Sequence, residues 1–240
     1  MLSGVRFRVG GMSELQRWVS EAPAGTVWRL TAQGEHRVLP DGVMDLIWWG
    51  DRFLFAGPDL AAYTVAYEKP TELWGFRFAP GAAATLLKMP ANELLGTSLF
   101  DADIPGLPSS AFDAMHRNPE ATLHAITQRL WNRVDADRRD LALVASIDRD
   151  AHAGLDVRTI ADRHNLSERS LRRLSHRAFG YGPKTLASIH RFQRALHLAR
   201  SGTPLADAAQ AAGYADQSHL SRETKRLAGV PLTSLISPAS

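Results

Sequence analysis

The spacing of apolar residues changes about half way along the chain. Between residues 26 and 78, aromatic and β-branched residues come in short runs separated by turn residues, a pattern typical of strands. This pattern predicts short strands at residues 26–30, 37–39, 45–49, 52–56, 63–67 and 73–78. Gly50-Asp51, between two of these runs, predicts a hairpin turn, and Pro80-Gly81 ends the strand-rich segment.

Helical spacing follows the strands. It predicts short helices at residues 82–88 and 91–95 and longer ones at 109–117 and 120–134. In the last of these an apolar stripe recurs at steps of three and four, formed by Leu123, Ile126, Leu130 and Val134. Such a stripe must be covered, so it packs either inside the subunit or against a second copy of the chain.

Residues 157–178 form two short amphipathic helices separated by a three-residue break. Asn165 stands where the turn needs a residue that tolerates positive φ, Leu166 plugs the corner, and the Ser167 hydroxyl can cap the second helix. This is the spacing of a helix-turn-helix motif.

The second helix of this motif carries a basic face. One face holds apolar residues, and another, at positions i, i+3, i+4 and i+7, holds Arg169, Arg172, Arg173 and His176. A solvated face with ordinary i,i+4 ion pairs is the alternative, but Glu168 is the only acid among these residues. Within a helix-turn-helix motif, we interpret the arginines as DNA contacts.

A second copy of the motif follows at residues 205–227, offset by 48 to 49 residues. Gly213 takes the place of Asn165, and Asp216 can cap the following helix. The apolar spacing of residues 184–200 predicts a connecting helix that spans about 25 Å. With helix packing at either end, this rod could place two recognition helices about 34 Å apart, in successive major grooves of B-DNA.

The charge is distributed unevenly between the two halves. Residues 1–137 hold 12 Lys and Arg against 16 Asp and Glu, whereas residues 138–240 hold 16 against 9, a net charge of +7. Excess positive charge in the C-terminal part is expected of a module that binds a polyanion.

The segment from about Leu141 to Leu235 resembles the DNA-binding domain of AraC/XylS-type transcription regulators, through IADRHNLSERSLRRL, FQRALHLARSG and AAQAAGYADQSHLSRETKRLAGVPL. The resemblance implies base-edge and groove contacts by Arg169, Arg172, Arg173, Gln217, Ser218, Ser221 and Arg222, with His176 and Lys225 on phosphates. The chain departs from the family pattern at three places. Thr224 stands where the family usually has Phe, Pro231-Leu232 replaces Ser-Pro, and Leu235 replaces Tyr. These departures predict looser packing of the second motif. The N-terminal half is similar to a poorly characterised domain of one subset of these regulators.

Together these patterns predict an α+β protein. We expect a strand-rich regulatory or ligand-binding domain at residues 1–100, with a barrel-like arrangement as one option. A helical linker and dimerisation element at 101–136 and an all-α double helix-turn-helix domain at 137–240 would follow. The expected function is sequence-specific DNA binding that regulates transcription, with an N-terminal domain that senses an effector or dimerises.

The N-terminal half offers only weak candidates for a site. Aromatic side chains could line an apolar ligand pocket, and the residues proposed for it are Trp28, Trp48, Trp74 and Arg77. Core packing explains the tryptophans at least as well. His36 with Asp41 and Asp45 is a poor metal site, since a metal needs several converging ligands, and these residues fit turn and strand-edge positions better. We expect no metal, no cofactor and no catalytic residue.

The chain has no cysteine, which excludes disulfides, thiolate metal sites and a cysteine nucleophile such as that of alkyl-transfer DNA repair. No membrane span or signal peptide stands out, so a cytoplasmic protein is expected. Double-stranded DNA is the expected partner, with a small-molecule effector, RNA polymerase and a second copy of the chain as further ones. The alternatives are an N-terminal half that binds a protein partner and no small molecule, or a fused enzyme domain.

Overall fold

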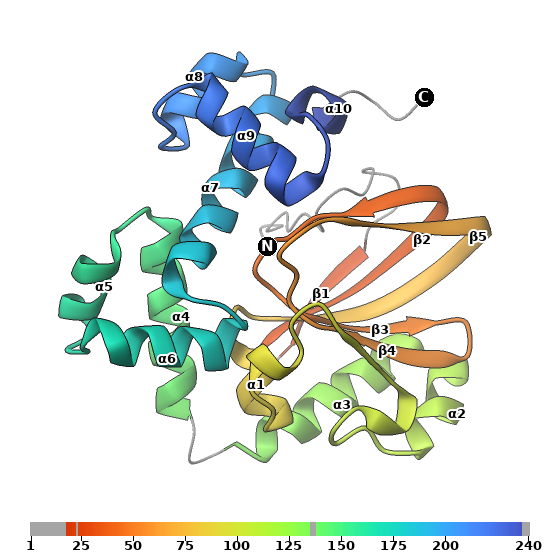
Figure 1. Cartoon of the computed structure of the whole chain (residues 1–240). Helices are drawn as coiled ribbons and strands as arrows, with labels where there is room; N and C mark the ends of the chain where they lie inside the picture. Colours follow the sequence, from red (N-terminus) through yellow and green to blue (C-terminus); the bar gives the residue numbers. More distant parts are fainter. Residues whose placement is uncertain (1–17, 23, 135–137, 237–240) are drawn as a thin grey trace, which may run out of the picture.

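The computed structural model describes residues 18–22, 24–134 and 138–236. The N-terminal half forms a six-stranded antiparallel sheet in the order β1-β2-β5-β3-β4-β6 (Figure 1). Its strands are β1 (Trp18–Ala22), β2 (Gly25–Val38), β3 (Asp45–Trp49), β4 (Arg52–Ala56), β5 (Tyr63–Phe78) and β6 (Ser98–Phe100). Strands β1 and β6 stand at the two edges and do not pair with each other, so the sheet is open and the barrel-like option is wrong.

Two pairs of predicted short strands are single long strands. β2 and β5 pair from Gly25 opposite Phe78 to Val38 opposite Tyr63, with one register shift between Ala32 and Gly34. The polar stretch inside β5, which includes Pro70, suggested a break, but the two backbones pair on both sides of it. The predicted β3–β4 hairpin is confirmed, with Trp49 opposite Arg52 and Gly50 at φ 70°.

The N-terminal core lies between one face of the sheet and the helices α1 (Ala82–Leu87), α2 (Ser110–Arg117) and α3 (Pro119–Asn132). Residues 91–95, predicted as a short helix, form the 3-10 turn η1 (Ala91–Glu93), and a second turn η2 covers Asp101–Asp103. The sheet contributes Val27, Leu46, Trp48, Phe53, Phe55, Phe76 and Phe78 to this core.

The apolar stripe of α3 is buried in the same core. Leu123, Ile126, Leu130 and Val134 are each at most 4% exposed. Of the two predicted uses of the stripe, packing inside the subunit is confirmed, and the stripe is not available to a second copy. The helices expected to link the two domains therefore share the core of the sheet.

The C-terminal half is helical: α4 (Arg138–His152), α5 (Val157–Arg163), α6 (Glu168–Phe179), α7 (Pro183–Arg200), α8 (Leu205–Ala211), α9 (Gln217–Ala228) and α10 (Leu232–Ile236). Helix α7 connects the α5–α6 pair to the α8–α9 pair, which lies at its other end (Figure 1). Among the described residues, no helix has the length and apolar character needed to cross a membrane.

The two domains contact each other at both helix pairs. A side chain at Gly180, the C-cap of α6, would collide with Pro58, and its φ of 87° also favours glycine. At the other pair, the Ala62 N–H donates to the Leu227 carbonyl at 2.7 Å, and Arg37 donates to the Ala228 carbonyl at 3.1 Å. The N-terminal domain therefore holds the C-terminal ends of both α6 and α9.

Candidate nucleic-acid interface

The turn of the first motif has the predicted local geometry. Asn165 adopts φ 52°, Leu166 packs against the helical core, and the Ser167 hydroxyl accepts from the Ser170 N–H at 3.1 Å. Helix α5 is capped as well, because Asp156 accepts the N–H of Thr159 at 3.0 Å and its hydroxyl at 2.7 Å. These bonds pull the pKa of the exposed Asp156 carboxyl below its usual value.

Helix α6 presents its predicted basic face to solvent. Arg169, Arg172 and Arg173 are exposed and His176 is half-buried, and apolar residues of the opposite face, such as Leu171, are buried. In the described part of the chain the three arginines make no side-chain hydrogen bond or ion pair. Several other arginines of this domain do: Arg163 pairs with Asp150, and Arg226 with Glu223. When Arg169, Arg172 and Arg173 bind an anion, they therefore break no hydrogen bond or ion pair within the described part of the chain.

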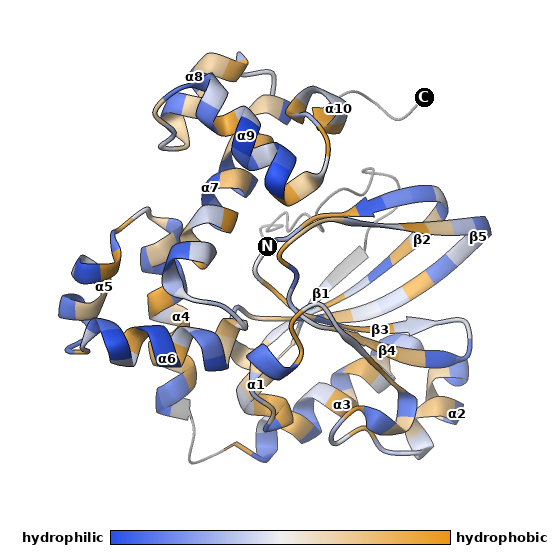
Figure 2. Ribbon diagram, in the orientation of Figure 1, coloured by the Kyte–Doolittle hydropathy of each residue, from blue (hydrophilic) through white to orange (hydrophobic). Residues whose placement is uncertain are grey.

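The second motif repeats the turn with different residues. Gly213 adopts φ 86°, and the Asp216 carboxylate accepts the His219 N–H at 2.6 Å, capping α9. The predicted contact residues Gln217, Ser218, Ser221, Arg222 and Lys225 are all exposed on α9. In Figure 2 the ribbons of α6 and α9 show strongly hydrophilic segments interrupted by apolar ones, as expected of helices with one polar face.

Two inward-facing residues of the second motif differ in how they pack. His219 lies edge-on to Tyr214 with ring centroids 5.2 Å apart. Thr224, which stands at the position of the family Phe, is fully buried and its hydroxyl has no hydrogen-bond partner. A buried hydroxyl without a partner lowers the stability of this motif.

Helix α7 is bonded to its neighbours by polar pairs. Near the middle of the helix the His190 ring contacts Asp148 of α4 at 2.8 Å, and both side chains are buried. On the side of the second motif, Ser188 donates to Glu223 of α9, which also pairs with Arg226 at 2.8 Å. The hydrogen bond from Arg226 lowers the pKa of Glu223 to about 2. The 18 residues of α7 span about 27 Å at about 1.5 Å per residue, close to the predicted length of the rod.

Two family models match the chain. One, described as a helix-turn-helix domain, matches residues 160–236, which include both recognition helices. The other, described as a domain of unknown function (DUF6597), matches residues 12–100. The chain therefore combines a C-terminal helix-turn-helix domain with an N-terminal domain of this second family. A comparison with curated protein sequences finds no match.

Three of the solved structures that are similar to the chain cover different shares of it. An apo ToxT variant from Vibrio cholerae is 11% identical with a TM-score of 0.50, and the match covers 89% of this chain and 97% of the other. A probable AraC family transcriptional regulator from Rhodopseudomonas palustris is 20% identical, with a TM-score of 0.36 over 40% of this chain and 94% of the other. The C-terminal domain of AraT, a response regulator from Geobacillus stearothermophilus, is 24% identical, with a TM-score of 0.35 over 39% and 88%.

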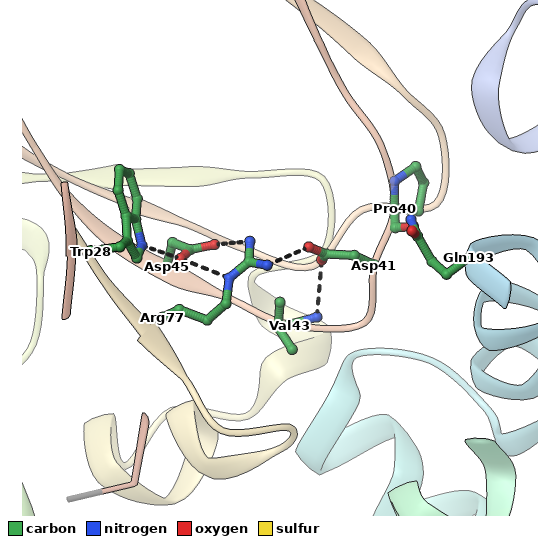
Figure 3. Close-up of polar contacts among 7 residues, drawn as sticks. All are labelled: Trp28, Pro40, Asp41, Val43, Asp45, Arg77 and Gln193. Atoms are coloured by element: carbon green, nitrogen blue, oxygen red, sulfur yellow. Dashed lines mark hydrogen bonds and ion pairs between the residues drawn. The ribbon is translucent and has the colours of Figure 1, made fainter. Parts of the chain in front are cut away.

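Two of the residues proposed to bind an effector lie in a buried polar cluster of the N-terminal domain. Arg77 lies between Asp41 and Asp45, with ion pairs of 2.9 and 2.7 Å, and the Trp28 indole donates to Asp45 at 2.9 Å (Figure 3). Burial raises the pKa of Asp41, and the two carboxylates raise that of Arg77 despite its burial. The cluster reaches the DNA-binding domain through the loop between β2 and β3, where Gln193 of α7 donates to the carbonyl of Pro40, the residue before Asp41, at 2.6 Å (Figure 3).

The other two proposed effector residues lie apart from this cluster. Trp48 is 5% exposed and packs edge-on against Phe53 at 4.8 Å, while Trp74 is half-buried and donates to Glu72. The structure has a cavity of about 750 Å³ and one of about 260 Å³, and neither is lined by Trp28, Trp48, Trp74 or Arg77. His36 bonds the backbone of Gln33, away from Asp41 and Asp45, and the described residues include no group of three metal-binding side chains.

Two cavities lie elsewhere. The larger, of about 750 Å³, separates α6 from the N-terminal domain and is lined by Arg169, Arg172, His176 and Lys184 on one side and by Leu60 and Leu95 on the other. The smaller, of about 260 Å³, includes Asp59, whose pKa is raised to about 6 by burial and by Asp41. No sequence pattern singles out Lys184 or Leu60, because their place in this lining depends on how the two domains pack.

Proposed function

We propose that this protein reads two successive major grooves of one DNA site with α6 and α9, and that its N-terminal domain controls this binding in response to a small molecule. The observation that carries the proposal is the pair of capped helices with exposed polar and cationic residues at the two ends of one helix, α7. Arginine suits bidentate donation to guanine O6 and N7, and glutamine suits adenine N6 and N7.

The side chains of α6 and α9 suit different contacts with DNA. Arg169, Arg172 and Arg173 supply guanine contacts and attraction to phosphates, whereas Gln217 and Arg222 supply base contacts in the second half-site. His176 and Lys225, in the last turns of their helices, are proposed as phosphate contacts. Because the α3 stripe is buried within the chain, we propose that one protomer suffices for one site with two base blocks.

Selection of binding sites from random duplex DNA tests the proposal, with the full chain at fixed salt and the variants Arg172→Ala and Arg222→Ala. The expected result is two enriched base blocks about one helical turn apart, each degraded by one variant only. Arg149→Ala is the matched control, since Arg149 is an exposed arginine of α4 outside both motifs. Binding without an enriched motif, falling only with salt, would contradict sequence-specific reading.

A further inference from the structure

The cleft of about 750 Å³ has walls from both domains. One wall is the basic face of α6, with Arg169, Arg172 and His176, continued by Lys184 at the start of α7. The facing wall comes from the N-terminal domain and includes Leu60 and Leu95. The cleft therefore exists only where the N-terminal domain packs beside the first recognition helix.

The two walls differ in chemistry. Leu60 is 39% exposed, an unusual exposure for a large apolar side chain in this protein, and Leu95 is half-buried beside it. Across the cleft, Arg169, Arg172 and Lys184 are exposed and make no ion pair among the described residues. Glu168 is the one acidic residue of the lining. An apolar wall facing unpaired cations fits a molecule with an apolar body and one anionic group.

We infer that this cleft binds a small apolar molecule carrying a carboxylate, sulfonate or phosphate group, and that this ligand competes with DNA for Arg169 and Arg172. The volume lies within the range of about 300–1,000 Å³ typical of small-molecule sites. The competition rests on the proposed function, because it requires that the two arginines contact DNA. A ligand seated in the cleft occupies their guanidinium groups, so each ligand molecule bound removes one DNA-binding surface.

A matched pair of fluorescent probes separates the two parts of the site. Anilinonaphthalenesulfonate has an apolar body and a sulfonate, and phenylnaphthylamine has the same body without the sulfonate. The sulfonated probe is expected to bind the full-length protein with one site and at least about tenfold more tightly, the factor that one charge-assisted contact supplies. Duplex DNA is expected to displace it, and the probe is expected to raise the apparent Kd for DNA in proportion to its concentration.

The variant Leu60→Asn tests the apolar wall without touching a residue of the DNA-binding helices. It is expected to weaken probe binding about tenfold, from the loss of one apolar side-chain contact, and to leave DNA affinity without probe unchanged. Phe100→Asn is the matched control, because Phe100 is also 39% exposed but lies on β6, outside the cleft lining. Both variants are checked by thermal unfolding, since a partly unfolded protein binds this probe non-specifically.

The outcomes separate the inference from the proposed function. If the protein binds its selected DNA but the probe does not bind, binds equally to Leu60→Asn, or is not displaced by DNA, the inference is wrong and the proposed function stands. If the probe binds in a Leu60-dependent way but no duplex binds the protein, the proposed function and the competition are both wrong, and only the ligand site remains.

Discussion

The two helix-turn-helix motifs have the same spacing but differ in how they are stabilised. In the first motif both helices have side-chain N-caps, Asp156 for α5 and Ser167 for α6. In the second only α9 has one, from Asp216, whereas α8 begins after Pro204 without a side-chain cap. The second motif is instead bonded to the N-terminal domain through the backbone of its recognition helix.

The motifs also differ in chemistry. The predicted contact face of α6 carries three unpaired arginines, while that of α9 is mostly neutral, with Gln217, Ser218 and Ser221 beside Arg222 and Lys225. The two copies therefore differ in two respects. The first motif has side-chain caps on both helices and supplies most of the positive charge, whereas the second has one capped helix and is hydrogen-bonded to the N-terminal domain through backbone carbonyls of α9.

The largest expected effect comes from removing one base-reading arginine. Arg172→Ala should weaken binding to the selected site by about 10- to 100-fold at fixed salt, since a bidentate arginine–guanine pair is worth about 1–3 kcal/mol. Arg222→Ala should lower the affinity by a smaller factor, because the predicted contact face of α9 carries less positive charge than that of α6 and so contributes less to binding. Fluorescence anisotropy with labelled duplex measures both. A larger loss from Arg222→Ala than from Arg172→Ala would reverse the comparison.

Arg37→Ala tests the dependence of the second motif on the N-terminal domain. The substitution removes the bond to the Ala228 carbonyl and should lower the free energy of unfolding by about 1.5 kcal/mol, near the lower value for a bond from a charged group. Hydrogen exchange should increase in α9 and not in α6. Arg29→Ala, which breaks an exposed ion pair with Glu72, is the control and should cost under about 1 kcal/mol. Equal exchange in α6 and α9 would count against the difference.

Thr224→Val should stabilise the second motif. The isosteric change removes a buried hydroxyl that has no partner, so we expect the free energy of unfolding to rise by about 1 kcal/mol in urea titrations. Thr127→Val is the matched control, since Thr127 is also buried but its hydroxyl donates to the His124 carbonyl at 3.0 Å. A loss of stability in Thr224→Val would show that the hydroxyl has a partner.

The smallest effect concerns the cap of α5. Because the pKa of Asp156 is lower in the folded than in the unfolded protein, its contribution is present above the unfolded pKa of about 3.9 and is lost as the pH falls below it. Asp156→Asn keeps a capping side chain but cannot titrate. Its stability should therefore depend less on pH between about 4 and 2 than that of the wild type, when unfolding is followed by circular dichroism. Parallel pH curves would contradict the assignment.

Local features of the motifs could be predicted from the sequence because they depend on neighbouring residues. The positive φ of Asn165 and Gly213 and the caps by Ser167 and Asp216 all lie within a few residues of their partners. The hairpin of β3 and β4 and the core stripe of α3 belong to the same class.

Other features depend on long-range packing and were outside the reach of periodicity. The long β2–β5 ribbon is held by backbone pairing that polar side chains do not reveal, and the edge strands β1 and β6 are short. The bond from Arg37 to Ala228 joins residues 191 positions apart. The cleft beside α6 likewise combines Leu60, Leu95 and Arg172 from three separate segments.

The central claim is that one chain reads two grooves with a fixed separation between its recognition helices. Inserting about 5 bp between the two selected base blocks tests it directly, because half a helical turn moves the second block to the opposite face of the DNA. The account predicts that the insertion lowers wild-type affinity by more than Arg222→Ala does on the original site, because it removes the Gln217 and Lys225 contacts as well, and that the insertion costs Arg222→Ala less than it costs the wild type. Unchanged wild-type affinity would show that the two motifs do not read the site together.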